Sequence, residues 1–430
     1  LILPGNVASA TGGAYEVANS CRFNSADSAY LNRTLGTPTN NKIWTLSFWV
    51  KRSGSGNQMI TSTDSSRGYM YFGTDQLAFE QYSGGFEYRL KTNRLFRDFS
   101  AWYHVCLAVD TTQGTASNRM KLYVNGTQET SFEFATYPAE DFNTSFNSAV
   151  SHFIGREGTT YFDGYLAEMV LVDGQALTPT SFGEFDSDSP TIWKPKDVSG
   201  LTFGTNGFYL DFEASGNLGN DANGGTDWTE NNLAATDQMT DTPTLNYSTI
   251  GTLFTALNAP TYSEGNLQSY STASGAYPIP SSIGVANGKW YMELKYAATT
   301  SNDNTGVGIT HDPASANQSN TDQGGYSVNY YASNGYIDLY GSNGGTFSSY
   351  TVGDIIGIYM DIDNQKLYFS KNGTLQNSGT GLNITTSTTG FYYFQVNDFT
   401  SSSNYWTWQW NFGAGCPFTI SSGNTDDNGY

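Results

Sequence analysis

The sequence predicts an all-β protein made of antiparallel strands. Three observations predict this fold class. Apolar and polar residues alternate with a period of two in many short segments, which is typical of strands with one buried face. Asn-Gly pairs, the strongest two-residue hairpin signal, follow two of these segments. No segment of ten or more residues shows the 3.6-residue period of a helix.

Length, composition and charge limit the number of domains and the kinds of partner. The 430 residues are too many for one ordinary core, so we expect two or three domains. Aromatic residues make up 15% of the chain, enough to bury a core although only 38% of residues are hydrophobic. The formal net charge of −20 repels phosphate backbones and anionic lipids, so we expect no nucleic acid partner. No apolar run is long enough to span a bilayer, so we expect no membrane insertion.

The first half of the chain carries a succession of strand-like stretches. The stretch at 42–53, "KIWTLSFWVKRS", has apolar groups on both faces, as a strand inside a sandwich has. The stretch at 101–128 holds an alternating strand and ends its second strand with an Asn125-Gly126 turn. Further strands of this half are expected within 14–34, 68–82 and 152–177.

The order of motifs in these stretches resembles the laminin G-like, concanavalin A-type jelly roll. The shared motifs are S-x-W-V-K, W-Y-H-V-x-L-x-x-D, L-Y-V-N-G, I-G-R and F-x-G-x-L-x-E. The resemblance covers about residues 10–185, and we assign residues 1–185 to this domain. The positions that match the motifs are Trp49, Trp102, His104, Asp110, Asn125, Gly126, Gly155, Gly164 and Glu168.

The last part of the chain is organised around residues 353–373. Alternation predicts two adjacent antiparallel strands there, with Ile356, Ile358 and Leu367 buried, and Asn372-Gly373 supplies a turn. Together with "GKWYMELKY", "GVGIT" and "WNFGAG", this stretch resembles the SPRY domain. The resemblance implies a bent sandwich that binds partners through its loops and is not a catalyst. We assign residues 260–420 to this domain and 421–430 to a tail, and leave open whether the polypeptide continues.

The two resemblances together imply two antiparallel jelly-roll-like β-sandwiches, joined by a linker that holds an extra strand. The segment between the two domains, residues 186–259, is expected to be this linker, with a partial strand. Residues 186–205 hold two prolines and no clear alternation. Residues 206–232 contain one strand and then a run of Gly, Asn and Asp. This piece is either the opening of another laminin G-like unit that is never completed or an extra strand packed onto one of the sandwiches.

The stretches "VANSCRFNSADSAYLNRT" and "YFDGYLAEMVLVDGQALTPTSFGE" also resemble structural proteins of tailed phages of aquatic bacteria. In those proteins a laminin G-like sandwich often precedes a SPRY-like one. The resemblance implies a place on the virion surface, in a tail fibre or a head appendage, with other virion proteins as partners. We therefore expect a homo-oligomer or many copies per particle.

Three functions are open at this point. The first is a non-enzymatic adhesin that binds a host-surface glycan through sandwich loops. The second is a decoration or connector protein that contacts only other virion proteins. The third, which we favour least, is a glycan-cleaving enzyme.

The sequence patterns do not favour catalysis. Retaining glucanases of the concanavalin A-type shape carry an E-x-D-x-x-E strand, which places two carboxylates about 5 Å apart on one face. The nearest fragment here is Glu184-Phe185-Asp186, and no Glu stands three residues further on. A Ser-His-Asp grouping in space stays open, but no G-x-S-x-G nucleophile elbow supports one. We therefore expect no enzyme. The three histidines are scattered at His104, His152 and His311.

Calcium is an open question for the first domain. Many laminin G-like domains bind it at the sandwich rim through carboxylates and carbonyls, so the resemblance makes Asp110, Asp163 and Asp173, near predicted strand ends, the candidate ligands. Asp221 and Asp227 offer further carboxylates, but the spacing of an EF-hand is absent. The alternative is that all of these are ordinary turn aspartates, so no cofactor is certain.

Only 13% of the residues are charged, so most surface groups must be neutral amides and hydroxyls. Such groups suit sugars, and they equally suit solubility alone. Tyrosines near predicted turns are the candidate ligand residues, with packing in the core or at a sheet edge as the alternative: Tyr330, Tyr331, Tyr336, Tyr340 and Tyr350. A second aromatic set shares one face of a strand and is expected to pack in the core: Trp406, Trp408, Trp410 and Phe412.

Overall fold

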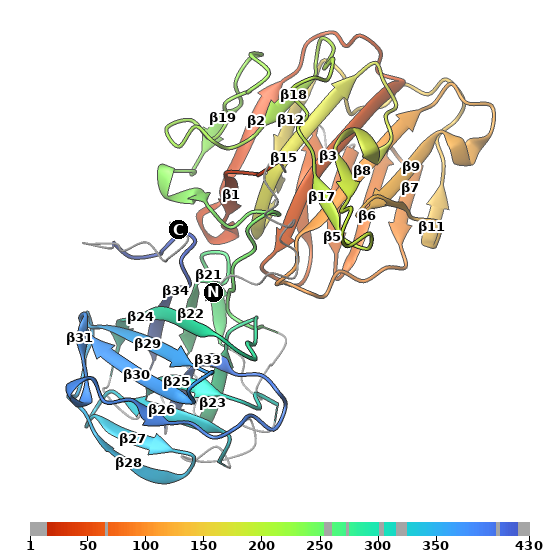
Figure 1. Ribbon diagram of the computed structural model, residues 1–430. Helices are drawn as coiled ribbons and strands as arrows, with labels where there is room; N and C mark the ends of the chain where they lie inside the picture. The colour runs from red at the N-terminus through yellow and green to blue at the C-terminus, as the bar shows by residue number, and fades with distance from the viewer. Residues whose placement is uncertain are drawn as a thin grey trace. The chain divides into compact units, whose positions relative to one another are not determined.

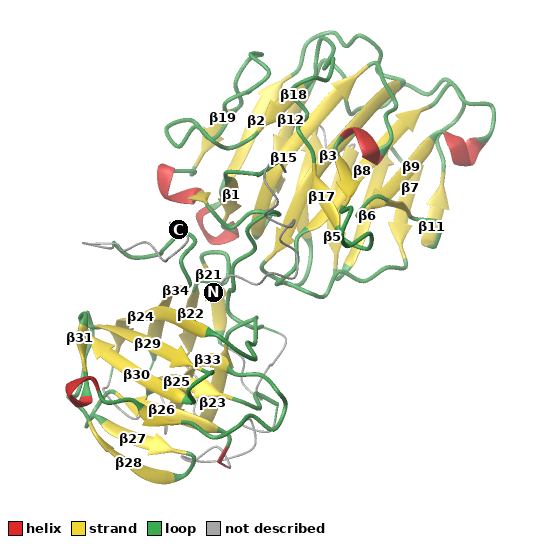
Figure 2. Cartoon of the chain, in the orientation of Figure 1, coloured by secondary structure: helices red, strands yellow, loops and turns green. Residues whose placement is uncertain are grey.

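The computed structural model describes residues 15–64, 68–252, 260–271, 275–300, 305–314, 325–400 and 405–419. These residues form antiparallel strands and short 3-10 helices, and they include no α-helix (Figure 2). The predicted all-β fold class is therefore confirmed. The chain divides into two compact units, a first unit that ends at Asn246 and a second unit that begins at Tyr247.

The first unit is a sandwich of two antiparallel sheets (Figure 1). Its first sheet has the strand order β10-β9-β8-β3-β15-β1-β20, and β18 also pairs with β15. The strands of this sheet are β1 (Ser20–Phe23), β3 (Ile43–Arg52), β8 (Tyr103–Asp110), β9 (Met120–Val124), β10 (Thr127–Gln128), β15 (Gly164–Asp173), β18 (Phe208–Leu210) and β20 (Gln238–Met239).

The second sheet of the first unit has the order β11-β7-β6-β5-β4-β12-β2-β19. Its strands are β2 (Tyr30–Thr34), β4 (Gln58–Thr63), β5 (Gly68–Gly73), β6 (Gln76–Tyr82), β7 (Phe86–Thr92), β11 (Phe132–Thr136), β12 (Ser151–Ile154) and β19 (Thr229–Asn231). Two small hairpins pair β13 (Arg156–Glu157) with β14 (Thr160–Tyr161), and β16 (Gly183–Phe185) with β17 (Trp193–Pro195). The 3-10 helices are η1 (Ser25–Asp27), η3 (Ala116–Asn118), η4 (Pro179–Ser181) and η5 (Ala235–Asp237).

Both faces of the first sheet are buried, as the two-sided apolar pattern of 42–53 predicts. Trp44 and Phe48 of β3 point into the core between the sheets, whereas Trp49 packs in a cluster on the outer face. The segment around β16 and β17 covers that outer face, and Trp193 lies 5.7 Å, ring to ring, from His104. Gly126 allows this approach, because a Cβ atom there would meet the Trp193 ring at 2.3 Å and the residue has a φ of +75°.

Residues 186–246 belong to the first sandwich, so the expected linker boundary at 185 is wrong. Strands β18, β19 and β20 pair with β15, β2 and β1 respectively, which adds the segment to both sheets. Phe208 and Leu210 lie in the same core as Trp44. Of the two alternatives for residues 206–232, the structure therefore shows the extra strand packed onto a sandwich. The compact unit ends at Asn246 instead of residue 185.

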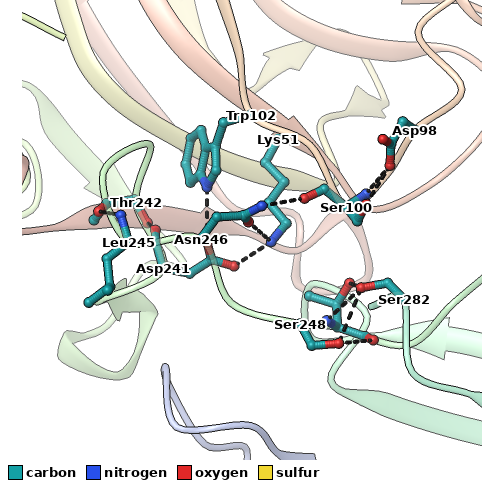
Figure 3. A network of polar contacts seen from close by, with 12 residues as sticks. Lys51, Asp98, Ser100, Trp102, Asp241, Thr242, Leu245, Asn246, Ser248 and Ser282 are labelled. Atoms are coloured by element: carbon teal, nitrogen blue, oxygen red, sulfur yellow. Dashed lines mark hydrogen bonds and ion pairs between the residues drawn. The ribbon is translucent and has the colours of Figure 1, made fainter. Parts of the chain in front are cut away.

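The end of the first unit is held by a buried polar network. Lys51 and Trp102 both contact the Asp241 side chain, and Asn246 contacts Lys51 (Figure 3). Lys51 Nζ lies 2.7 Å from Asp241 Oδ2, and it also donates to Asn246 Oδ1 at 2.8 Å. The Trp102 indole N–H donates to Asp241 Oδ1 at 2.9 Å. The network joins the last residues of the unit to the C-terminal end of β3.

The second unit is a separate two-sheet sandwich (Figure 1). Its larger sheet runs β21-β22-β34-β24-β29-β30-β31, with β32 also paired to β30, and the other runs β23-β33-β25-β26-β27-β28. The larger sheet contains β21 (Thr261–Ser263), β22 (Gln268–Ser271), β24 (Lys289–Thr299), β29 (Ile355–Asp361), β30 (Lys366–Lys371), β31 (Thr374–Leu375), β32 (Leu382–Asn383) and β34 (Trp406–Asn411). The other contains β23 (Gly275–Pro280), β25 (Gly306–Thr310), β26 (Ser327–Tyr331), β27 (Tyr336–Leu339), β28 (Ser342–Thr346) and β33 (Tyr393–Thr400), and η8 spans Asn377–Gly379.

The central hairpin of the second unit forms as the alternation predicts. Strands β29 and β30 pair antiparallel, and Ile356, Ile358 and Leu367 are fully buried. Asn372 and Gly373 both have positive φ, 48° and 78°, as a type I′ turn requires, and they connect β30 to β31. The prediction that the alternating tryptophans of β34 pack in the core is also confirmed for Trp406, Trp408 and Trp410.

Candidate ligand-binding surface

Three of the five tyrosines expected to bind a ligand lie in the core of the second unit. Tyr330 and Tyr350 are almost completely buried and pack edge to face, with ring centroids 4.9 Å apart. The Tyr350 hydroxyl donates to the Tyr330 carbonyl at 2.8 Å. Tyr331 is also buried. These three rings stabilise the sandwich and present no face to a ligand, which is the alternative that the sequence left open.

Tyr336 and Tyr340 are half-buried and stay candidates. The Tyr336 ring stacks on Tyr331 at a centroid distance of 6.3 Å. The Tyr340 hydroxyl accepts a hydrogen bond from the Thr385 backbone N–H, and its ring lies 5.7 Å from the His311 ring. Much of each side chain is therefore engaged within the protein, and their role in binding remains a prediction.

The three aspartates suggested as calcium ligands do not come together. Asp110 and Asp173 are paired with the neighbouring residues Ile43 and Trp44, so they end strands at one end of the first sheet. Asp163 precedes β15 and therefore lies at the opposite end of that strand. Within the described ranges, no group of three or more His, Cys, Asp or Glu side chains is placed to hold a metal ion.

Protein donors already occupy the oxygens of these three carboxylates. Asp173 accepts hydrogen bonds from the backbone N–H groups of Thr39 at 2.6 Å and Asn206 at 3.1 Å, and from Asn147 Nδ2 at 2.7 Å. Burial opposes ionisation of Asp173, but these hydrogen bonds hold its pKa below the ordinary value. Asp163 accepts from the Ser25 N–H and hydroxyl, and Asp110 from Thr112 and Gln113.

The fragment Glu184-Phe185-Asp186 does not have the charge environment of a glycosidase acid. Both carboxylates face Lys194, at 3.4 and 3.5 Å from its Nζ. Asp186 also accepts from the backbone N–H groups of Asp188 and Ser189, which lowers its pKa from the ordinary value. A general acid in glycoside hydrolysis needs a raised pKa.

A polar cavity of about 230 Å³ lies at one end of the first sandwich. Gln81 and Ser145 contribute to its wall, and Gln81 Oε1 accepts from both the Ser145 N–H and the Ser145 hydroxyl. The volume is below the 300–1,000 Å³ typical of small-molecule sites. Its lining consists mainly of neutral amide and hydroxyl groups, with Asp64 as the carboxylate.

The outer face of the second sheet, here called the open face, is a candidate surface of the first unit. Register places one residue from each strand in a single row across this face. In contrast to the first sheet, the alternate residues of this face are half-buried or exposed at many positions. The row runs Thr229, Asn32, Phe153, Ser62, Tyr69, Glu80, Arg89 and Thr136.

An aromatic cluster marks one end of the open face. The Arg156 guanidinium lies 4.6 Å from the ring centroid of Tyr30, 5.6 Å from Phe153 and 5.9 Å from Tyr161. The Ser62 hydroxyl donates to the Arg156 carbonyl at 2.7 Å, which fixes the strand beneath the cluster. The stacked guanidinium holds the half-buried rings in place.

A second cluster marks the other end of the open face. Arg89 lies between the rings of Phe86 and Phe134, at 4.4 and 4.1 Å from their centroids. Its Nε is 3.0 Å from Glu80 Oε2, and the Tyr71 hydroxyl donates to Glu80 Oε1 at 3.3 Å. Burial raises the pKa of Glu80 above the ordinary value, although Arg89 opposes this shift.

The second unit carries a row of three tyrosines on the outer face of its larger sheet. Tyr291, Tyr359 and Tyr368 are direct cross-strand partners on β24, β29 and β30. The rings of Tyr291 and Tyr359 are 4.4 Å apart, and Tyr291 is 42% exposed. Gly357 makes room for this row, because a Cβ atom there would meet the Tyr291 ring at 3.0 Å.

The sequence contained a signal for these surfaces that the choice of turn tyrosines missed. Tyr69 and Tyr71 alternate with Met70 and Phe72, which lie in the core, so the tyrosines must point outward. The same alternation places Tyr359 opposite to Ile358. Periodicity within strands therefore marks outward-facing tyrosines better than proximity to turns does.

Comparisons with known proteins agree with the lectin-type fold of the first unit. Residues 23–181 match the sequence profile of the family described as the Concanavalin A-like lectin/glucanases superfamily, which confirms the predicted laminin G-like domain. No curated protein sequence is significantly similar to the chain. No helix in the described part of the chain has the length and apolar character needed to cross a membrane.

Solved structures that resemble parts of the chain include SPRY domains, a pentraxin and a protein described as carbohydrate-binding. The SPRY domain of human HERC1 is 21% identical, with a TM-score of 0.30, over 34% of this chain and 89% of that one. The heptameric SAP-like pentraxin from Limulus polyphemus is 17% identical, with a TM-score of 0.28, over 38% of this chain and 80% of that one. A protein from Bacteroides ovatus to which carbohydrate binding is ascribed is 18% identical, with a TM-score of 0.33, over 50% of this chain and 59% of that one.

Proposed function

We propose that this protein is a non-enzymatic adhesin of a phage virion surface, which binds a host-surface glycan on the open face of its first unit. The observation that carries the proposal is the row of eight cross-strand residues, from Thr229 to Thr136, which combines aromatic rings with amide and hydroxyl groups. The family match of residues 23–181 to lectins and glucanases supports a carbohydrate ligand.

The chemistry of the open face fits a neutral polyhydroxylated chain. Tyr69 and Phe153 offer apolar ring surface to the C–H faces of sugar rings, while Asn32 and the exposed Thr229 are hydrogen-bonding neighbours. Strands lie about 4.8 Å apart, so the row extends roughly 30 Å and spans several sugar units. An open row of this kind suits a polymer better than a single monosaccharide.

Weak binding at each site is sufficient for attachment. An open face buries less of a ligand than a deep pocket, so we expect millimolar affinity for one copy. Several copies on one particle raise avidity by roughly 10²–10⁴ without any new contact, provided that the copies can engage one surface together.

The test is a binding measurement on the double variant Tyr69→Ala/Tyr71→Ala, with the intact chain displayed in many copies on a bead or particle. We expect attachment to host-surface polysaccharide to fall strongly and free polysaccharide to compete with the unaltered protein. Phe391→Ala is the control, since Phe391 is also exposed but belongs to a loop of the second unit. Unchanged attachment of the double variant at unchanged thermal stability would contradict the proposal.

A connector role is the second candidate, and one observation favours it. Tyr82, Phe86 and Phe134 are 40–46% exposed and gather near β11, an edge strand whose pairing is to β7 alone in the described sheet. Exposed apolar groups beside an unpaired strand edge are a common site of protein association. A map of the intact particle decides between the two roles. If a neighbouring virion protein covers the open face, the protein is a connector and not an adhesin.

A further inference from the structure

Three buried polar side chains line one small cavity inside the first unit. The cavity has a volume of about 10 Å³ and lies among apolar side chains of both sheets, with Asn147, His152 and Trp228 in its wall. These residues are 0%, 4% and 3% exposed. One polar atom of each has no hydrogen-bond partner in the protein: Asn147 Oδ1, His152 Nε2 and Trp228 Nε1.

The orientation of the Asn147 amide is fixed by its nitrogen. Nδ2 donates to Asp173 Oδ1 at 2.7 Å and to the Asn40 carbonyl at 3.2 Å. Both partners are acceptors, so a flipped amide would place its oxygen against two oxygens. The carbonyl oxygen of Asn147 is therefore the unpaired atom, an acceptor on a residue that lines the cavity.

The tautomer of His152 follows from its other nitrogen. Nδ1 lies 2.9 Å from the Val150 carbonyl, which can only accept, so Nδ1 carries the proton. Burial lowers the pKa of His152 to about 4, despite the opposing effect of this hydrogen bond, so the ring is neutral at pH 7. Nε2 then bears a lone pair and is a second acceptor.

Trp228 completes the set with the opposite character, because an indole N–H only donates. The residues that line the cavity thus carry one unpaired donor and two unpaired acceptors. A cation would meet the N–H group, and an anion would meet two lone pairs, so neither fits. A neutral molecule that accepts once and donates twice fits all three groups, and the volume admits one molecule of the size of water.

We propose that this cavity binds one internal water molecule, which accepts a hydrogen bond from Trp228 and donates to Asn147 and His152. Three partners are the usual number for a buried water, and each buried polar atom left unpaired would cost free energy. The water links the loop at 147, strand β12 and the segment that leads into β19.

The water site is not part of the open face, but it adjoins a strand at the edge of that face. Trp228 is followed directly by β19, the strand at one edge of the open face, and Asn231 of β19 donates to Asn32 Oδ1 at 2.7 Å. Holding Trp228 in the cavity therefore fixes where β19 begins. The inference does not depend on the glycan proposal, since it concerns the core.

The first test is a crystal structure of the intact chain at a resolution that shows ordered waters. We expect a spherical density peak within hydrogen-bonding distance of Asn147 Oδ1, His152 Nε2 and Trp228 Nε1. A well-ordered but empty cavity, or a direct contact among the three side chains, would overturn the proposal.

The second test uses Trp228→Phe, which keeps an aromatic ring and removes the donor. With a bound water, the variant loses a hydrogen bond and leaves the water with two partners, so the melting temperature falls below that of the control. Trp193→Phe is the control, because the Trp193 N–H is also buried without a protein partner and the change in volume is the same. Without a water, both variants relieve an unpaired donor, and equal shifts in the two would count against the site.

Discussion

Lys51 Nζ and Asp241 Oδ2 form a 2.7 Å ion pair in the interior of the first unit, although 190 residues separate them in the sequence. The two side chains are 0% and 3% exposed. Asn246 and Trp102 supply further hydrogen bonds, so both charged groups are compensated. The fold of the first unit therefore depends on residues that lie some sixty positions beyond the expected domain end at 185.

Removing one partner of this pair should destabilise the first unit severely. Asp241→Ala leaves the Lys51 ammonium buried without its counter-charge, which costs about 3–5 kcal/mol in comparable cases. The measurement is the free energy of unfolding by denaturant, followed by tryptophan fluorescence. Glu140→Ala is the matched control, because Glu140 pairs with Arg119 at 3.3 Å but is 56% exposed, and such pairs contribute about 0–1 kcal/mol. Equal effects of the two substitutions would show that the buried network does not hold the unit together.

The core of the second unit should be sensitive to Ile358→Ala. Ile358 is fully buried in β29 between the two sheets, so truncation removes apolar contacts and leaves a cavity, at a cost of about 2–5 kcal/mol. Val352→Ala serves as the control, since Val352 is 44% exposed and its truncation should change stability little. A loss below 1 kcal/mol for Ile358→Ala would mean that the core around β29 repacks.

Alternation within strands predicted the local structure of this chain well. The β29–β30 hairpin and the inward tryptophans of β34 follow from a period of two, because one face of each strand is apolar along its whole length. The positive φ angles of Asn372 and Gly373 were also predictable, because Asn-Gly is the pair preferred in type I′ turns, which require positive φ at both residues.

Long-range pairing was harder to predict. Strand β18 has three residues, Phe208–Leu210, and nothing in so short a segment indicates that its partner is β15. Tyr330 and Tyr331 are adjacent in β26, and all five residues of that strand are buried, so alternation could not show which side faces solvent. Such features depend on what covers a strand, and that information lies elsewhere in the chain.

The stability of the first unit should depend on the ionisation of Glu168. Burial raises the pKa of Glu168 to about 7, although the hydroxyls of Tyr209 and Tyr15 donate to it at 2.8 and 2.9 Å. Because the folded pKa lies above the ordinary value, the stabilising contribution is complete below about pH 4.5 and is lost as the pH rises through 7. Each pKa unit corresponds to about 1.4 kcal/mol.

The measurement is the denaturant midpoint of the intact chain and of Glu168→Gln between pH 4.5 and 8. The variant should lose the decline of stability toward pH 7, since its amide does not titrate. His104 and His152 act in the opposite direction, because burial lowers their pKa values to about 3 and 4, and they destabilise the fold as the pH falls below 6.5. Identical pH profiles of the variant and the unaltered protein would show that Glu168 is not the titrating group.

Calcium should not control the stability of the first unit through Asp173. Its two oxygens accept hydrogen bonds from Thr39, Asn40, Asn147 and Asn206, so a metal ion would have to displace these donors. We expect the same melting temperature in calcium and in a chelator. Asp173→Asn should lower stability by about 1.5–3 kcal/mol in both conditions, because hydrogen bonds to a charged acceptor are lost. A calcium-dependent rise in the melting temperature that disappears in Asp173→Asn would restore the metal site.

The tyrosine row of the second unit should contribute to glycan attachment independently of the open face. Tyr291 is 42% exposed beside Tyr359, and its hydroxyl donates to Glu293 Oε1 at 2.7 Å. These contacts fix the orientation of the ring at the surface. Tyr291→Ala should weaken binding of one copy about fivefold or more, corresponding to roughly 1 kcal/mol, with little change in the melting temperature.

Tyr291→Phe separates the two properties of this side chain, because it keeps the ring and removes the hydrogen bond to Glu293. If the ring face carries binding, Phe should retain most of the affinity that Ala loses, as measured by isothermal titration with host-surface oligosaccharide. Combining Tyr291→Ala with Tyr69→Ala/Tyr71→Ala should add the two losses, since the sites belong to different compact units. If Tyr291→Ala binds as the unaltered protein does, the first unit alone recognises the glycan, and the second unit has another partner.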